Sequence, residues 1–197
     1  MLAYLLDDGL RDTLNRAQSN YWDVYIQEIV EMLGLRGRRL CLAELTDERV
    51  LGSVSTLLVG AQSGAHLSEA QVGALEGWVR AGGLLIGFAL TRLDQVFGIR
   101  TRDTIRQQPD DWSISACFEL WPHPLTREVH PALLAEQRLL ALSDVQLVGL
   151  AGSEELARLY DTSGTDTGCP AITWHAYGHG HAGYFAFDAA KTIWVLH

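Results

Sequence analysis

Short apolar segments alternate with amphipathic ones through the first hundred residues. Four of the apolar segments predict strands, at residues 2–6, 39–43, 55–59 and 84–88. They are brief and do not alternate with polar residues, which is typical of parallel strands buried on both faces. Between the first two, Trp22, Tyr25, Ile26, Ile29 and Leu33 recur at helical spacing and predict a helix over 20–33.

The helix before the fourth strand has the clearest boundaries. Ser68 and Gln71 have the spacing of a capping box, which predicts a helix start. Gly82 and Gly83 end this helix, and a further helix is expected to begin near Thr91, whose hydroxyl would cap it. The order of elements predicts an α/β fold with a mostly parallel, doubly wound, three-layer sheet of the flavodoxin-like kind.

The second half is less regular. Strands are predicted at 113–121, 145–150 and 155–160, with a short helix opening at Pro131. Segments 171–176 and 182–187 predict an antiparallel hairpin in which Gly178 and Gly180 take positive φ, and 189–197 a closing helix. No linker interrupts the pattern, so residues 1–197 are interpreted as one domain.

Composition and charge exclude several functions. A net charge of −9 over 197 residues argues against nucleic-acid or anionic-membrane partners. Three scattered cysteines, Cys41, Cys117 and Cys169, form no disulfide framework and include no persuasive nucleophile. Without a signal peptide or membrane span, a cytoplasmic protein is expected. Lys191 is the only lysine, so it is the one candidate for Schiff-base chemistry. No cofactor is expected.

The C-terminus lies within an apolar run, Trp194-Val195-Leu196-His197. Two explanations fit: the chain is the N-terminal part of a longer protein, or a helix docks to its very end.

Two patches carry a resemblance to a known superfamily. Residues 78–89 read Trp-Val-Arg-Ala-Gly-Gly-Leu-Leu-Ile-Gly-Phe-Ala, and residues 172–185 contain the Gly-x-Gly hairpin followed by Tyr-Phe. Together they cover about an eighth of the chain. They resemble the class I glutamine amidotransferase-like fold, nearest to its ThuA-like branch and the middle domain of bacterial β-galactosidases. The resemblance implies a sharp turn from strand to helix after residue 88.

The catalytic residues of that superfamily are missing. An amidotransferase needs a cysteine at the turn, where a helix N-terminus lowers the thiol pKa. Ala89 occupies the matching position, and the chain contains no His-x-Glu. The resemblance therefore implies the fold without glutaminase activity, and whether the chain is an enzyme stays open.

Polar residues at the expected strand ends are candidates to line a ligand pocket, because open α/β sheets bind ligands at that edge. The candidates are Asp7, Asp8, Gln62, Ser63, Thr91, Arg92 and Asp94. The carboxylates could hold a cation or act in acid–base chemistry, and Arg92 could bind an anion. For Asp7 and Asp8 a solvated turn is the favoured interpretation.

No metal site is expected. The weak alternative is a zinc site formed by His175, His179 and His181, since three imidazoles can bind zinc. A glycine-rich hairpin with surface histidines is the favoured interpretation. Trp112 and Trp121 have no clear place, and burial in the core is favoured for both.

Three functions remain. The favoured one is a catalytically silent domain that binds a small molecule, a carbohydrate or a further domain of the same protein. The second is a carbohydrate-active hydrolase that uses the strand-end carboxylates or the histidines. The third is a structural oligomerisation domain that forms homo-oligomers.

Overall fold

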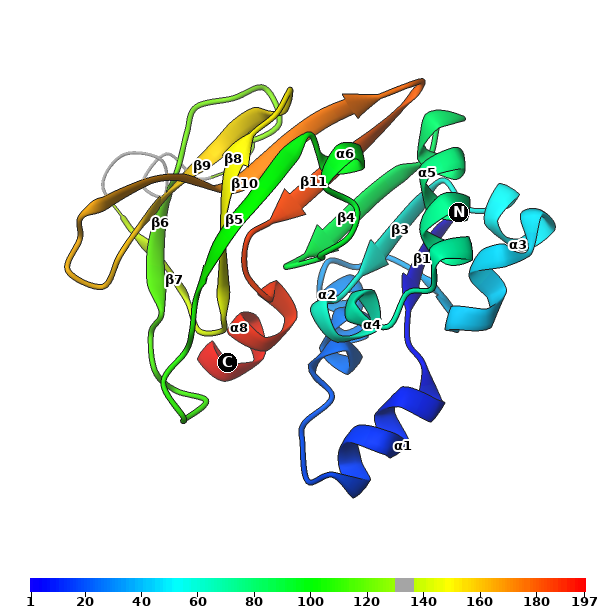
Figure 1. Cartoon of the computed structure of the whole chain (residues 1–197), viewed down its shortest axis with the longest axis horizontal. Helices are drawn as coiled ribbons and strands as arrows, with labels where there is room; N and C mark the ends of the chain where they lie inside the picture. The colour runs from blue at the N-terminus through cyan, green and yellow to red at the C-terminus, as the bar shows by residue number, and fades with distance from the viewer. Residues whose placement is uncertain (130–136) are drawn as a thin grey trace.

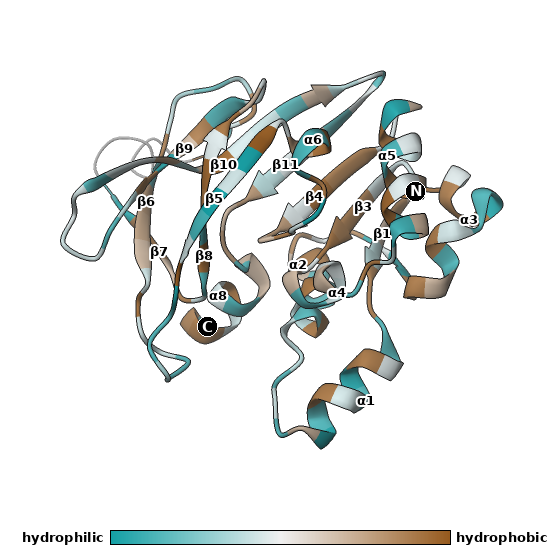
Figure 2. Ribbon diagram, in the orientation of Figure 1, coloured by the Kyte–Doolittle hydropathy of each residue, from teal (hydrophilic) through white to brown (hydrophobic). Residues whose placement is uncertain are grey.

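Five parallel strands form one half of a nine-stranded sheet in this computed structural model, which describes residues 1–129 and 137–197 (Figure 1). In spatial order they are β2 (Arg38–Leu40), β1 (Leu2–Leu5), β3 (Thr56–Val59), β4 (Leu84–Phe88) and β11 (Gly180–Phe185). Figure 2 shows β3 and β4 as predominantly hydrophobic. Ala3, Leu57 and Leu85 are fully buried, as expected for strands covered on both faces.

The other half of the sheet is antiparallel. It continues from β11 through β10 (Asp166–Tyr177), β9 (Glu154–Tyr160), β6 (Ala116–Leu120) and β7 (Leu139–Ala141). A separate two-stranded sheet pairs β5 (Ile99–Ile105) with β8 (Val145–Leu150). The structure confirms the predicted α/β class. Its large central sheet contains parallel strands as well as the C-terminal hairpin.

Most of the helices lie around the parallel half of the sheet, while the first one projects away from it (Figure 1). The helices are α1 (Asp8–Arg16), α2 (Tyr25–Met32), α3 (Glu48–Gly52), α4 (Ala61–Ala65), α5 (Glu69–Arg80), α6 (Asp94–Phe97) and α8 (Ala189–Leu196), with 3-10 turns η1 (Trp22–Val24) and η2 (Leu42–Thr46). Across the sheet, the step from β1 to β2 and the step from β3 to β4 run in opposite directions. Right-handed crossovers therefore place α2 and α5 on opposite faces. Helix α8 contacts α2, and α3 contacts α5.

Several local predictions are confirmed and others are wrong. The capping box of Ser68 and Gln71 starts α5, and the helix over 20–33 is present as η1 and α2. Helix α1 was not predicted, because Asp7 was taken for a loop residue although its carboxylate caps the helix at Leu10. Strand β5 was also missed, since its polar residues face outward. The helix predicted at Pro131 lies outside the described residues.

The turn after β4 also differs from expectation. Helix α6 begins at Asp94 with Leu93 as its N-cap residue, so Thr91 does not cap it.

Among the described residues, no helix is both long enough and apolar enough to cross a membrane.

Two glycines shape the β10–β11 hairpin for different reasons. Gly178 has a φ of +63°, as predicted. The positive φ expected at Gly180 is wrong; instead, a side chain there would collide with the carbonyl oxygens of Val79 and Gly83. Gly180 therefore lets the hairpin lie directly against the end of α5.

Replacing Gly180 with alanine should push the hairpin away from α5. We expect Gly180→Ala to lower the free energy of unfolding by roughly 1–3 kcal/mol, the usual range for overpacking. The matched control is Gly73→Ala within α5, where the added methyl meets open space and should stabilise by roughly 0.5–1 kcal/mol. Urea denaturation measures both, and equal effects would contradict the close approach.

Candidate functional site

A pocket of about 440 Å³ opens at the carboxyl ends of the parallel strands, the edge at which α4 and α8 lie (Figure 1). This edge is where open α/β sheets bind ligands. We call it the strand-end pocket. Its lining residues are Trp22, Ala61, Ala65, Ala89, Thr91, Arg106, Gln107, Ser143, Asp144, Gln146, Asp188 and Lys191.

Asp23 is fully buried next to the end of β3. Its carboxylate accepts hydrogen bonds from the backbone N–H groups of Ser63 (2.7 Å) and Gln62 (3.4 Å), both in α4. It thereby replaces the cap that Gly60, the N-cap residue of α4, cannot supply. A side chain at residue 60 would collide with this carboxylate. The end of β3 is therefore fixed by a carboxyl from η1.

Asp188 follows β11 and caps α8. Its carboxylate accepts a hydrogen bond from Lys191 N (3.0 Å), and its own N–H donates to the Ser143 hydroxyl (2.9 Å). Burial, followed by the negative charge of Asp23, raises the pKa of Asp188 to about 7. Burial also raises the pKa of Asp23. Both carboxyls are buried, and the negative charge of Asp23 adds to the cost of ionising Asp188.

Lys191 brings a positive charge to the pocket wall. Its ammonium donates hydrogen bonds to Asp111 Oδ1 (2.7 Å) and Gln107 Oε1 (2.8 Å), and it lies 4.8 Å from the centre of the Trp22 ring. These contacts offset the cost of burying an ammonium group, because a buried charge needs both a counter-charge and hydrogen bonds.

Ala89 forms the sharp turn after β4. Its φ of +48° lies in the left-handed region, which is uncommon for a residue with a side chain. Its N–H donates to Phe185 O (2.8 Å), which ties the turn to β11. The described residues that line the pocket include neither a cysteine nor a histidine. They therefore offer no thiol nucleophile and no imidazole base.

Of the seven predicted pocket residues, only Thr91 lines the strand-end pocket. Asp7 caps α1, and Asp8 pairs with Arg11 and Arg39 on the surface. Both act as structural residues of the β1–α1 turn.

The other four also make internal contacts. The side chain of Gln62 binds Trp22 N and Asn20 O, and Ser63 is buried against the Tyr21 hydroxyl (2.8 Å). Arg92 pairs with Glu69 and donates to Leu67 O. Asp94 accepts hydrogen bonds from the backbone N–H and hydroxyl of Thr101.

The residues predicted from the sequence do not include Asp23, Asp188 or Gln107, and Lys191 was a candidate only for Schiff-base chemistry. One signal could have identified Asp188 and Lys191. They follow the last predicted strand at a spacing that places a capping carboxylate and an ammonium in the first turn of a helix. Because 182–187 was interpreted only as the partner of 171–176, its additional parallel pairing with β4 was not expected.

The three histidines do not converge. His175 lies opposite Ala182 and His181 opposite Ala176, so the two rings point to opposite faces of the hairpin. His175 Nδ1 lies 2.8 Å from Val96 O, and His181 stacks on Trp174. No group of three metal-ligating side chains occurs within the described part of the chain.

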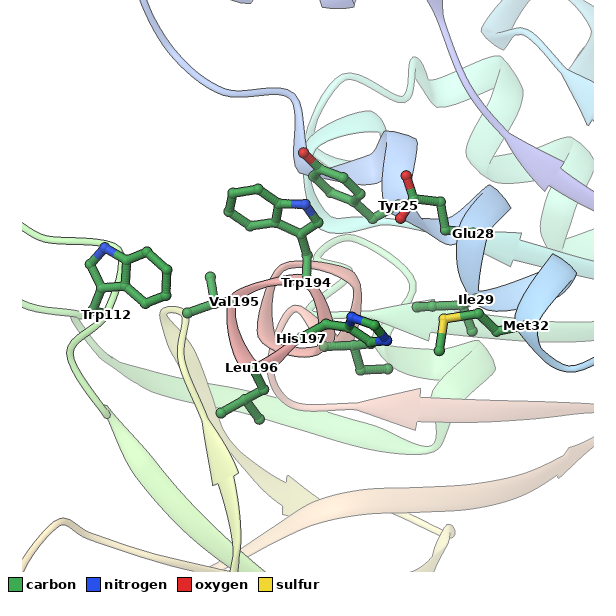
Figure 3. Close-up of a pocket in the computed structure, with 10 residues that line it drawn as sticks. Tyr25, Glu28, Ile29, Met32, Trp112, Trp194, Val195, Leu196 and His197 are labelled. Atoms are coloured by element: carbon green, nitrogen blue, oxygen red, sulfur yellow. The ribbon is translucent and has the colours of Figure 1, made fainter.

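An apolar groove of about 590 Å³ lies between α2 and α8 (Figure 3). Figure 3 shows Trp194 beside Tyr25, with Met32 further along the groove and Trp112 approaching from a separate loop. Trp112 is 68% exposed and Trp121 47% exposed, so the expectation that both are buried in the core is wrong. We call this surface the α2–α8 groove.

Comparisons with known proteins show similarity in fold alone. No protein-family model matches the chain, and no curated protein matches it in sequence. Among solved structures, a β-galactosidase from Bacillus circulans sp. alkalophilus superposes with a TM-score of 0.70 at 14% identity, covering 99% of this chain and 30% of its own. A catalytic mutant of a GH42 β-galactosidase from G. stearothermophilus gives 0.69 at 15% identity, covering 94% and 27%.

A smaller protein shares the fold as well. A cytoplasmic protein from Salmonella typhimurium gives a TM-score of 0.58 at 12% identity, covering 87% of this chain and 83% of its own. The chain spans less than a third of each of the two β-galactosidases. The β-galactosidase part of the expected resemblance is therefore confirmed for the fold, while the amidotransferase-like and ThuA-like part stays a prediction.

The raised pKa of Asp188 predicts a specific dependence of stability on pH. Because the folded-state pKa of about 7 lies above the ordinary value of 3.8, the folded protein retains a proton that the unfolded chain releases. The contribution of Asp188 to stability is therefore greatest below about pH 4 and falls as the pH rises to about 7.

Asp188→Asn removes this proton and keeps an oxygen that can cap α8. Relative to the wild type, we expect the variant to gain stability between pH 5 and pH 8. Urea denaturation at both pH values measures the difference in unfolding free energy. If the variant and the wild type differ in unfolding free energy by the same amount at pH 5 and pH 8, this would contradict a buried carboxyl at residue 188 with a raised pKa.

Proposed function

We propose that the chain is a catalytically silent glutamine amidotransferase-like domain, related to the ThuA-like and β-galactosidase middle-domain branches, that binds a small carbohydrate-related ligand in the strand-end pocket. One observation carries the proposal. The left-handed turn at Ala89 opens onto a polar pocket whose described lining residues offer no cysteine and no histidine. Strained turns of this kind gather at functional sites.

The pocket chemistry supports a polyhydroxylated ligand. Gln146 and Asp144 line the pocket with an amide and a carboxylate, and Thr91 adds a hydroxyl. Sugar hydroxyls both donate and accept hydrogen bonds, which such groups satisfy. The Trp22 ring supplies an apolar wall. A volume of about 440 Å³ falls in the usual range for small-molecule sites.

A carbohydrate-active hydrolase remains the alternative. Glycoside hydrolysis commonly uses two carboxyls that flank the scissile bond. Asp7 and Asp8 do not line the pocket, and neither does Asp23, which is fully buried. Asp144, which does line it, is held by Arg106 (2.5 Å) and the backbone N–H of Gln107 (2.9 Å). Asp188 alone remains as a candidate acid, so the geometry favours binding.

Structural oligomerisation is a second candidate function, favoured by the α2–α8 groove. Met32, Trp112 and Leu196 are each more than half exposed there, which suits burial against a second copy of the chain. Light scattering at tens of micromolar should then show an oligomeric mass, and Met32→Glu together with Leu196→Glu should give a monomer. A monomeric wild type would contradict this candidate.

The binding proposal predicts where on the protein a sugar binds. In backbone amide NMR spectra, titrated galactose should shift the signals of Thr91, Gln107 and Ser143 and leave those of the α2–α8 groove unchanged. Ala65→Trp fills the pocket at an exposed position of α4 and should weaken binding at least tenfold. The matched control, Ala17→Trp at the exposed end of α1, should bind normally.

Turnover assays complete this test. Neither glutamine nor a nitrophenyl galactoside should be hydrolysed by the wild type. Sugar binding that survives Ala65→Trp would contradict the proposed place, and sustained hydrolysis of either substrate would contradict catalytic silence.

A further inference from the structure

We infer that the strand-end pocket binds a sugar acid, a polyhydroxylated ligand with one carboxylate, and that Asp111 occupies the position which the ligand carboxylate takes at Lys191. This inference rests on the proposed function and assigns the chemical class of the ligand. Four features of the described residues support it.

The first is the identity of the cation. Lys191 is the only lysine among 15 basic residues, and it is also one of the most buried charges, at 9% exposed. It lines both the strand-end pocket and an adjoining hollow of about 270 Å³ formed with residues 107–111 and Asp144. A ligand that enters either hollow therefore meets the Lys191 ammonium.

The second feature is the unequal burial of the ion pair. The side chain of Lys191 is 11% exposed, whereas that of Asp111 is 46% exposed. A half-exposed carboxylate loses little by turning into water. The buried ammonium cannot follow it and would retain Gln107 as its remaining hydrogen-bond partner. It would therefore need a new anionic partner.

The third feature is the segment that carries Asp111, which is held mainly by its own contacts. The Gln107 side chain donates hydrogen bonds to Asp111 O (3.3 Å) and Ser113 O (2.8 Å), and Asp110 caps Trp112 N (2.9 Å). These bonds do not require the Asp111 side chain. The carboxylate can therefore leave Lys191 while its loop keeps its shape.

The fourth feature is the charge of the other pocket groups. Asp144 is neutralised by Arg106. Burial and Asp23 raise the pKa of Asp188, so this carboxyl carries less negative charge near neutral pH than an exposed aspartate would. The pocket can therefore accept an anion, while Thr91 and Gln146 remain for hydroxyl groups.

The test compares two sugars with the same ring. Galacturonate carries a carboxylate where galactose carries a hydroxymethyl group. At pH 7, calorimetry on the whole chain should show galacturonate binding at least tenfold more tightly than galactose. Lys191→Met keeps the unbranched side chain up to the ε position and removes the charged ammonium group. It should remove this preference, so that galacturonate and galactose bind the variant with similar affinity.

A second variant keeps the test valid if Lys191→Met fails to fold. Asp111→Asn weakens the internal competitor and should tighten galacturonate binding several-fold. The matched control Asp12→Asn, an exposed aspartate of α1, should leave it unchanged. Equal affinity for the two sugars, or weaker galacturonate binding by Asp111→Asn, would overturn the inference. If galactose binds in the pocket without a preference for the acid, only the inference fails; if neither sugar binds there, the proposed function fails too.

Discussion

The fully buried Asp23 carboxyl is the interaction on which the pocket end of this fold depends. It accepts the backbone hydrogen bonds that start α4, and it requires glycine at residue 60. The same helix places the Ser63 hydroxyl against Tyr21, whose hydroxyl accepts a hydrogen bond from Asp7 N (3.0 Å). One polar network therefore joins the ends of β1 and β3. Satisfied networks of this kind rigidify the structure, because leaving any member unpaired is costly.

The pocket also needs residues from around the separate β5–β8 sheet. Gln107, Asp144 and Gln146 come from the segments around β5 and β8, whereas Ala89 and Thr91 follow β4. Asp188 connects α8 to the β7–β8 loop, because its carboxylate caps α8 and its N–H donates to the Ser143 hydroxyl. The negative charge of Asp23 contributes to the raised pKa of Asp188, so the carboxyl that fixes α4 also affects the charge of the pocket lining. Burial thus sets both the shape and the charge of the site.

Local signals made much of the fold predictable. Helix α5 and strand β4 follow from the capping box at Ser68 and a continuous apolar run, both of which act within a few residues. Helix α1 was missed because an Asp-Asp-Gly sequence fits a turn as well as a helix cap. The site was harder to predict, because Lys191 meets Asp111 and Gln107 at separations of 80 and 84 residues. Most of the predicted strand-end residues form hydrogen bonds to backbone groups or ion pairs within the fold. Their positions in the sequence do not distinguish these internal contacts from ligand binding.

The buried pair of Asp23 and Asp188 is tested most directly by following the carboxyl carbons of both residues by NMR as the pH is raised from 3 to 9. If the two carboxyls are buried together, the Asp188 signal should titrate with a midpoint near pH 7, and that of Asp23 should titrate above the ordinary range of aspartate. Midpoints near pH 4 for both residues would contradict the burial of the two carboxyls and the effect of Asp23 on Asp188.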